Sequence, residues 1–399
     1  MDFDTARIRS RFPALARGVA YFDGPGGSQV PAEVAQAVAD TMCAGIANRG
    51  TVTAAEQRAE ATVVEARQAV ADLLGCSPAG VVFGRSATQL TFDMARALAK
   101  QWAPGDEVIV TGLDHDANIR PWVHAAHAAG ATVRWAEPDS DTGDLPVEAV
   151  TALLSRRTRA VAVTAASNLL GTRPDIAGIA HAAHEVGALV HVDGVHLTPH
   201  APVDVEALGA DIYVCSPYKF FGPHLGVSVA APALLENVFP DKLLPSTDAV
   251  PERFELGTLP YELLAGTRAA VDVIADLVPT DGDRRTRVLT SMNAVEEHED
   301  RLLGRLLDGL AGLNGVTLHG SPAHRTPLAL FSVAGRSPQE VHERLAEQGI
   351  NAPAGSFYAL EASRWMGLGN TGAVRAGLAP YTDDEDVDRL LTGVAKLCP

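Results

Sequence analysis

Cysteine, aromatic residues and long apolar runs are all scarce in this chain of 399 residues. The four cysteines form no C-x-x-C pair and no other metal-ligand spacing, which argues against a disulfide framework and against a metal site. No apolar run reaches the about 18 residues that a membrane-spanning helix needs. The N-terminus also lacks the apolar core of a signal peptide. We therefore expect a cytoplasmic protein that does not associate with a membrane.

Basic residues are also few, since 32 Lys and Arg stand against 49 Asp and Glu, for a formal net charge of −17. Such a chain repels phosphate on average, which argues against nucleic acid and anionic membranes as partners. A local basic pocket for an anionic cofactor is compatible with this charge. The 47% of hydrophobic residues are sufficient for a large core.

Short apolar runs alternate with helical segments through the middle of the chain. The runs that favour strands cover residues 80–83, 107–111, 132–136, 160–165, 188–192 and 211–215. Buried strands separated by helices are typical of a parallel sheet that is covered on both faces. We therefore predict an α/β fold for this part of the chain.

The pattern changes near residue 280, after a turn-rich stretch. Residues 285–310 have an amphipathic pattern that predicts one long helix. Short strands are predicted at 315–318 and 328–333, and helices at 338–347 and 384–397. We predict a large domain over residues 16–280 and a smaller α+β domain made of residues 1–15 and 281–399.

Ligands of parallel α/β sheets bind at the carboxyl ends of the strands, so the residues that follow each strand are candidates for a site. Ser86, Ala87 and Thr88 follow the first strand and begin a helix. Backbone N–H groups and the helix dipole attract an anion at such a position. The same residues also suit an ordinary helix cap, and this pattern alone leaves both roles open.

Ionisable and amide side chains follow four further strands. Asp193 ends a buried strand, where a carboxylate needs a partner such as a protonated pyridine nitrogen or a structural ion pair. Lys219 lies beside aromatic residues, which can depress its pKa and make its amine nucleophilic, although most lysines are solvated surface charges. His115 and Asn168 follow the other two strands.

The candidate residues follow one another in the order of a known family: a hydroxyl loop, His115, Asn168, Asp193 and then Ser216-x-x-Lys219. This order resembles the class V aminotransferases, a family of pyridoxal 5′-phosphate (PLP) enzymes that includes cysteine desulfurases and selenocysteine lyases. The resemblance extends from residue 21 to residue 390, and SPYKFFGPHLG around the lysine is similar to a cysteine desulfurase-like subgroup. It implies PLP fold type I, in which a large domain has a mostly parallel seven-stranded sheet and a smaller C-terminal domain is α+β. It also implies PLP as cofactor and a homodimer.

The resemblance implies a role for each residue around the PLP ring. Lys219 would hold PLP as a Schiff base and then move protons, and Asp193 would pair with the pyridinium nitrogen. His115 would stack on the ring. Asn168 and His196 would bind the ring oxygen O3′.

The resemblance also places the phosphate and the substrate. The phosphate would lie against Ser86, Ala87, Thr88, Ser216 and Tyr218, with Thr258 contributed by the other subunit of the dimer. The substrate would be a small-molecule amino acid. Arg375 would bind its α-carboxylate, with Gly24 and Asn168 on the substrate side.

One departure from the family bears on the reaction. Cysteine desulfurases carry a nucleophilic cysteine on the loop before the arginine, whereas this chain has Tyr358 there and no cysteine between Cys215 and Cys398. We therefore predict a PLP-dependent lyase that cleaves the C–S bond of an S-substituted cysteine by β-elimination, without an enzyme persulfide. Lys219 would be the base, assisted by Tyr358 or His115. Three alternatives stay open: an aminotransferase of this family, an epimerase of this family, or a weakly catalytic partner protein with this fold.

Overall fold

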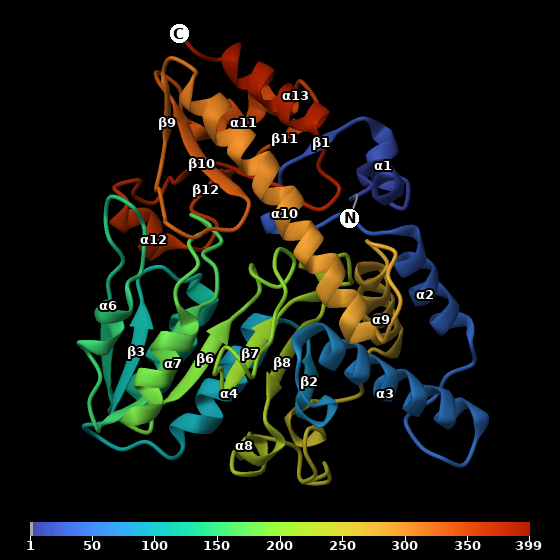
Figure 1. Ribbon diagram of the computed structural model, residues 1–399. Helices are drawn as coiled ribbons and strands as arrows, with labels where there is room; N and C mark the ends of the chain where they lie inside the picture. Colours follow the sequence, from blue (N-terminus) through green and yellow to red (C-terminus); the bar gives the residue numbers. More distant parts are fainter. Residues whose placement is uncertain (1–2) are drawn as a thin grey trace.

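The computed structural model describes residues 3–399, and a seven-stranded sheet forms its largest part (Figure 1). The strand order is β2-β8-β7-β6-β5-β3-β4, and β8 alone runs antiparallel to its neighbours. The strands are β2 (Val81–Gly84), β3 (Glu107–Thr111), β4 (Thr132–Ala136), β5 (Thr158–Thr164), β6 (Leu189–Asp193), β7 (Ile212–Cys215) and β8 (Gly226–Ala230). The predicted α/β fold with a mostly parallel seven-stranded sheet is confirmed.

Helices cover both faces of this sheet because successive residues of a strand point to opposite sides. Ile109 packs in one core with α3, α7 and α9, while its neighbours Val108 and Val110 pack in another core with α4 and α5. These helices are α3 (Ala54–Leu74), α4 (Ala87–Ala99), α5 (Arg120–Ala129), α7 (Ile176–Glu185) and α9 (Tyr261–Ala275). With both faces covered, the ends of the strands are the places where the sheet can meet a ligand.

A second sheet has four antiparallel strands in the order β12-β13-β10-β9. Its separate apolar core contains Phe331 and Val374 from the strands and Val341 and Val387 from the covering helices. The elements are β9 (Val316–Leu318), β10 (Leu328–Val333), β12 (Ala354–Gly355), β13 (Ala373–Gly377), α11 (Pro338–Ala346), α12 (Leu360–Trp365) and α13 (Asp384–Ala395). This part is the predicted smaller α+β region, and a short parallel pair of β1 (Ala20–Tyr21) and β11 (Ile350–Asn351) adds to it.

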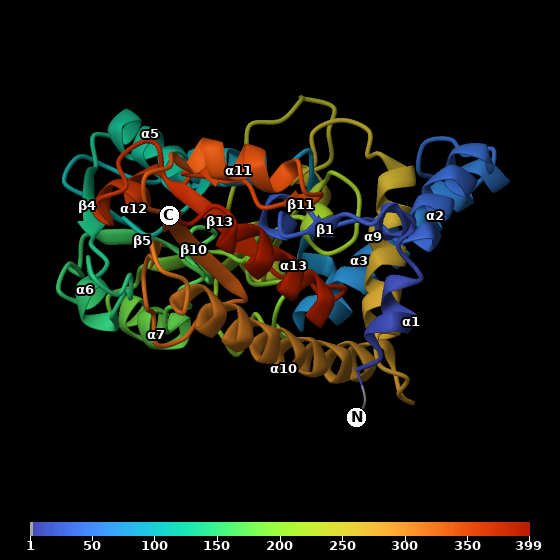
Figure 2. The ribbon, with the colours of Figure 1, turned by 90° about the horizontal axis from the view of Figure 1, so that it is seen from above.

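The long helix α10 (Arg284–Ala311) joins the two parts (Figures 1 and 2). Its first half contributes Val288 to the core of the large sheet, and its second half contributes Leu302 and Leu306 to the core of the small sheet. The helix predicted over residues 285–310 is therefore confirmed. The division of the chain at residues 16–280 stays a prediction, and residues 1 and 2 of its N-terminal piece lie outside the described residues.

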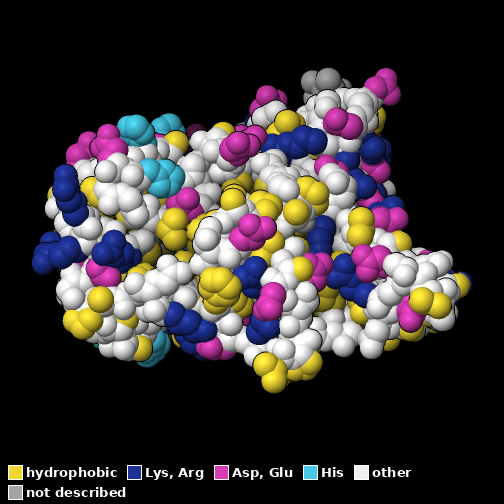
Figure 3. Space-filling view, turned by 90° about the horizontal axis from the view of Figure 1, so that it is seen from below, with side chains coloured by type: hydrophobic (Ala, Val, Ile, Leu, Met, Phe, Trp, Pro, Cys, Tyr) yellow, Lys and Arg dark blue, Asp and Glu magenta, His cyan; other side chains and the backbone are white. Residues whose placement is uncertain are grey.

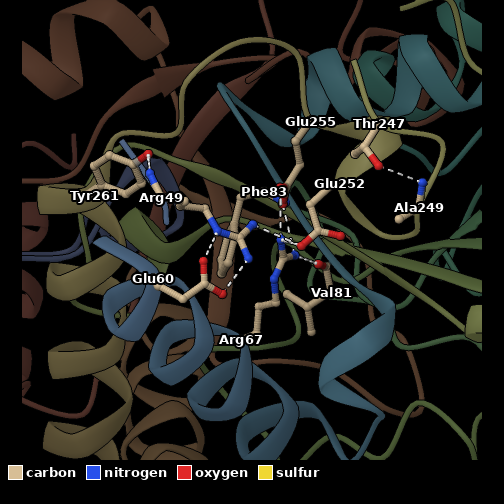
Figure 4. Close-up of polar contacts among 10 residues, drawn as sticks. All are labelled: Arg49, Glu60, Arg67, Val81, Phe83, Thr247, Ala249, Glu252, Glu255 and Tyr261. Atoms are coloured by element: carbon tan, nitrogen blue, oxygen red, sulfur yellow. Dashed lines mark hydrogen bonds and ion pairs between the residues drawn. The ribbon is translucent and has the colours of Figure 1, made fainter. Parts of the chain in front are cut away.

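A network of ion pairs fixes the segment between α8 (Pro232–Glu236) and α9 (Figure 4). Arg67 on α3 bonds to Glu252 at 3.2 Å and to Glu255 at 2.9 Å, and Arg49 bonds to Glu252 at 3.0 Å. Glu255 also accepts a hydrogen bond of 3.0 Å from the backbone N–H of Phe83 in β2. The side chains of Arg67 and Glu255 are only 7% and 4% exposed, so the charge of each is stabilised by the opposite charge of the other. This segment is thereby tied to α3 and β2.

The surface carries charges of both signs. On the face shown in Figure 3, Lys and Arg side chains are scattered among Asp and Glu. Within residues 3–399, no helix combines the length and the apolar character needed to cross a membrane. The remaining helices are α1 (Thr5–Arg9), α2 (Ala32–Cys43), α6 (Val147–Thr151) and α8 (Pro232–Glu236).

Candidate active site

A cavity of about 660 Å³ lies at the carboxyl ends of the parallel strands. Most of the residues predicted from the sequence line it, because the ends of parallel strands meet at one edge of the sheet. They are Ser86, Ala87, Thr88, His115, Asn168, Asp193, His196, Ser216, Tyr218, Lys219, Tyr358 and Arg375. The cavity therefore brings together residues that are almost 300 positions apart in the chain.

Two predicted residues do not line this cavity. Gly24 is buried behind it, while its neighbours Pro25 and Gly26 form part of the wall. Thr258 is exposed on the segment that follows the Arg67 network. Its expected position near the phosphate requires a second subunit, so its role stays a prediction.

Lys219 ends a short turn after β7 and is half-buried at the cavity wall. Its amine donates a hydrogen bond to the backbone carbonyl of Pro25 and lies 4.9 Å from the centre of the Tyr218 ring. Desolvation in this position and the positive charge of Arg375 lower the pKa of Lys219 to about 7, against the opposing charge of Asp193. A large fraction of this amine is therefore neutral and nucleophilic at neutral pH.

Asp193 is the last residue of β6 and is only 7% exposed. One carboxylate oxygen, Oδ1, accepts a hydrogen bond of 2.9 Å from the N–H of Val195. Burial raises the pKa of Asp193 to about 6, while this hydrogen bond and the charge of Lys219 act in the opposite direction. A carboxylate so poorly solvated is suited to a cationic partner in the cavity, such as a protonated ring nitrogen.

His115 is neutral in this site. Its Nδ1 accepts a hydrogen bond of 3.0 Å from the N–H of Ala117, which leaves the proton of the neutral ring on Nε2. Burial lowers the pKa of His115 to about 4, and the charges of Lys219 and Arg375 add to this effect. The ring lies 5.4 Å from the ring of Tyr358, with an interplanar angle of 29°.

The loop that carries Tyr358 is held over the cavity in a strained conformation. Phe357 and Tyr358 have φ angles of 52° and 60°, which cost non-glycine residues of the order of 1–3 kcal/mol each. Asn168 donates from Nδ2 to the carbonyl of Phe357 at 2.8 Å, and the N–H of Asp116 donates to the carbonyl of Tyr358 at 2.7 Å. The guanidinium of Arg375 lies 3.7 Å from the centre of the Phe357 ring. These contacts compensate the strain and leave the Tyr358 side chain 77% exposed at the mouth.

Several polar groups in the cavity wall lack a protein partner. Arg375 is 2% exposed, its Nη1 donates to the carbonyl of Asn168 at 2.7 Å, and its Nε is buried without a hydrogen bond. The side-chain oxygen of Asn168 is also buried without a partner. Such atoms are costly unless a ligand satisfies them. An anionic cofactor with a ring oxygen, together with a carboxylate substrate, would supply acceptors and donors of the kinds required.

The N-terminus of α4 lies in the cavity wall, where the sequence predicts either an anion site or an ordinary helix cap. Ser86 is the N-cap and its side chain accepts a hydrogen bond of 3.1 Å from the N–H of Gln89. The cap role is therefore observed, and the role of these residues in binding an anion stays a prediction. Ala87 and Thr88 line the cavity in the first turn, where backbone N–H groups and the helix dipole favour a phosphate.

Sequence reasoning missed Phe92 and Arg120, which also line the cavity. Phe92 comes four residues after Thr88 in α4, so the helical period could have placed both on one face. Arg120 begins α5 and pairs with Asp116 at 2.7 Å and with Glu361 of α12. No local signal marks Arg120, because its partner Glu361 is distant in the chain.

The fold and the site together define a PLP enzyme of fold type I. The chain belongs to the class V aminotransferase family, whose model matches residues 20–390. The members of this family depend on PLP, and the unpartnered groups described above fit that cofactor.

Known proteins resemble the chain over its whole length. An uncharacterized protein of Mycobacterium tuberculosis, MT3887, is 35% identical, with 100% of both chains covered. The aminotransferase-like protein FGM3 of Gibberella zeae is 34% identical, with 98% of each chain covered. Among solved structures, the cysteine desulfurase CsdA of Escherichia coli, in an S-sulfonic acid form, superposes with a TM-score of 0.87 at 29% identity. The match covers 99% of this chain and 98% of that one.

Proposed function

We propose that this enzyme cleaves the C–S bond of an S-substituted cysteine by β-elimination, without forming a persulfide on the protein. The observation that carries the proposal is the identity of the residue on the loop over the cavity, which is Tyr358 and not a cysteine. The four cysteines, Cys43, Cys76, Cys215 and Cys398, all lie outside the described lining of the cavity. A reaction at this site therefore has to proceed without an enzyme thiol.

Several residues of the cavity wall have a proposed partner on the cofactor. Asp193 would face the ring nitrogen, His115 would cover the ring, and Asn168 and His196 would bind the ring oxygen. The phosphate would be bound by Ser86, Ala87, Thr88, Ser216 and Tyr218, with Thr258 of the partner subunit. PLP, when bound, withdraws electrons from the α-carbon of an amino acid and so makes its proton acidic.

The protein's own side chains would then carry out the remaining steps. Arg375 would bind the α-carboxylate as a bidentate fork, with the segment around Gly24 on the substrate side. The amine of Lys219 would accept the α-proton, and the electron pair of the C–S bond would leave with sulfur. Tyr358 would donate a proton to that sulfur, since the neutral His115 is a weaker candidate donor. The overall balance is one water consumed and one thiol, one pyruvate and one ammonia released.

Purified enzyme with PLP and a panel of S-substituted cysteines tests this proposal. We expect thiol and pyruvate in equal amounts, with no requirement for an added α-keto acid, and no product from Lys219→Ala. Release of neither product from any conjugate would refute the proposal.

An aminotransferase is the second candidate, because a relative at 34% identity carries the name aminotransferase-like. The same assay separates the two reactions. Amino-group transfer to an added α-keto acid, without thiol or pyruvate, would favour the aminotransferase.

We also propose that the enzyme is a homodimer. The support is the position of Thr258, which is exposed and away from the cavity of its own chain, at the end of a segment fixed by buried ion pairs. The mass of the holoenzyme in solution tests this, and an active monomer would refute it.

A further inference from the structure

A buried, hydrogen-bonded pair of side chains lies on the side of the site that faces α10. His200, in the turn after β6, and Glu299, in the middle of α10, meet with Nδ1 and Oε2 at 2.9 Å. Their side chains are 5% and 1% exposed. Neither residue lines the cavity, and the reaction proposed above does not use either of them.

This pair is in contact with the cavity through one further ring. His196 lines the cavity, and its ring meets the ring of His200 edge-on, with centroids 5.1 Å apart and an interplanar angle of 72°. On its other side, Nε2 of His196 bonds to Oγ1 of Thr326 at 3.0 Å. An unbroken series of contacts therefore leads from the cavity wall to α10, the helix that joins the two sheets (Figure 1).

Stability alone gives no reason for a polar pair at this place. Both polar side chains are removed from water, and an apolar pair of similar shape can be about equally stable. One oxygen of Glu299, Oε1, is also buried without a hydrogen bond, which adds an uncompensated loss of solvation. What the pair does provide is a fixed orientation, because a ring bonded through Nδ1 cannot turn without losing that bond.

We propose that Glu299 and His200 are positioning residues that hold the imidazole of His196 in the orientation that binds the cofactor. Glu299 anchors His200, and His200 supports one face of His196 while Thr326 holds Nε2. The inference concerns cofactor binding and does not depend on which reaction the enzyme catalyses.

The most decisive test replaces the polar pair by an apolar one, in the double variant His200→Phe with Glu299→Leu. Two quantities are measured: the melting temperature, and the dissociation constant of PLP from fluorescence titration of the apoprotein. We expect a melting temperature that is unchanged or higher, with a dissociation constant raised about tenfold, which is the lower end of the loss seen when groups that orient metal-binding histidines are removed. A purely structural role would instead move stability and affinity together.

The control is the double variant Arg173→Leu with Glu296→Leu, which removes an ion pair of α10 that does not line the cavity. It should keep the affinity for PLP. The inference is overturned if the His200–Glu299 double variant binds PLP as the wild type does, or if the control weakens binding equally.

Single variants decide the question if the double variant does not fold. Glu299→Gln keeps an acceptor for Nδ1 of His200 and should bind PLP with nearly unchanged affinity, whereas Glu299→Ala should weaken binding. Equal affinities in these two variants would contradict the positioning role.

Discussion

Tyr358 presents a phenol at the mouth of the cavity, with its ring stacked on His115 and its backbone held by Asp116. A phenol cannot accept a sulfur atom as a thiolate does, but it can give a proton to a departing one. His115 is less suited to this task, because burial keeps its pKa near 4 and its ring neutral. We therefore propose Tyr358, and not His115, as the proton donor.

This assignment predicts a dependence on the leaving group in Tyr358→Phe. Alkyl thiolates are strong bases and need a proton as they leave, so kcat for S-alkyl cysteines should fall about 100-fold, the lower end of the usual contribution of general acid catalysis. Aryl thiolates are weaker bases, so kcat for S-aryl cysteines should fall much less. Steady-state kinetics on both substrate classes measure this, and an equal loss for both would contradict a proton-donor role.

A second prediction at this scale concerns Lys219. Only the neutral amine can react with PLP, and the pKa of Lys219 is lowered to about 7. The neutral fraction grows as the pH rises through the pKa, so the rate at which the apoprotein bonds to PLP should rise with pH and level off above about 8. Stopped-flow absorbance across pH 5 to 10 measures it, and a rate still rising steeply at pH 10 would mean an ordinary lysine.

The identities of these side chains could be predicted from the sequence, but their environments could not. Lys219 and Asp193 were found from their positions after strands and from the resemblance to a family, and Arg375 from that resemblance alone. The strain at Phe357 and Tyr358 was not predicted, because it is imposed by contacts with Asn168 and Asp116 from distant parts of the chain. Contacts between residues so far apart in the chain cannot be predicted from the local sequence.

At the scale of elements, strand β8 packs against the start of α4, where we propose that the phosphate binds. It was missed in the sequence, since its short run Gly226–Ala230 follows a loop and its antiparallel direction breaks the strand–helix alternation. The backbone of Gly226 lies so close to α4 that an added Cβ would be 2.2 Å from the carbonyl carbon of Ser86 and 2.5 Å from the nitrogen of Ala87. Only glycine allows this approach.

The substitution Gly226→Ala should therefore displace the first turn of α4. We expect the dissociation constant of PLP to rise about tenfold, which corresponds to about 1.4 kcal/mol. Fluorescence titration of the apoprotein measures it. Gly304→Ala is the matched control, since its Cβ would meet no atom within 4 Å, and it should leave affinity unchanged. Unchanged affinity for PLP in Gly226→Ala would contradict this prediction, because it would show that α4 accommodates the methyl group without disturbing the cofactor site.

The Arg67 network gives a stability prediction for the segment between α8 and α9. Arg67→Ala leaves the buried carboxylate of Glu255 without its cation and should lower the free energy of unfolding by about 3–5 kcal/mol. Arg268→Ala removes an exposed pair with Glu65 and should change it by no more than about 1 kcal/mol. Urea unfolding compares the two, and similar losses would contradict the importance of burial.

At the scale of the whole molecule, the alternation of strands and helices was sufficient to predict an α/β fold, because sheets covered on both faces require apolar strands. The helix over 285–310 was likewise predicted from its period and matches α10. The way in which α10 crosses from one core to the other was not predictable from its amphipathic pattern. The pattern shows that one stripe of the helix is buried, but it does not show which residues cover that stripe. The link from Glu299 through His200 to His196 was missed for the same reason.

The scarcity of cysteine allows the most direct test of the central claim, which is that C–S cleavage here uses no enzyme thiol. All four cysteines can be replaced in one variant: Cys43→Ser, Cys76→Ala, Cys215→Ala and Cys398→Ser. The measurement is kcat for thiol and pyruvate release from S-substituted cysteines, per folded molecule with bound PLP. We predict that the cysteine-free enzyme keeps the kcat of the wild type. Loss of thiol release in that variant, with PLP still bound, would contradict the claim and would favour a mechanism that forms a persulfide on an enzyme cysteine.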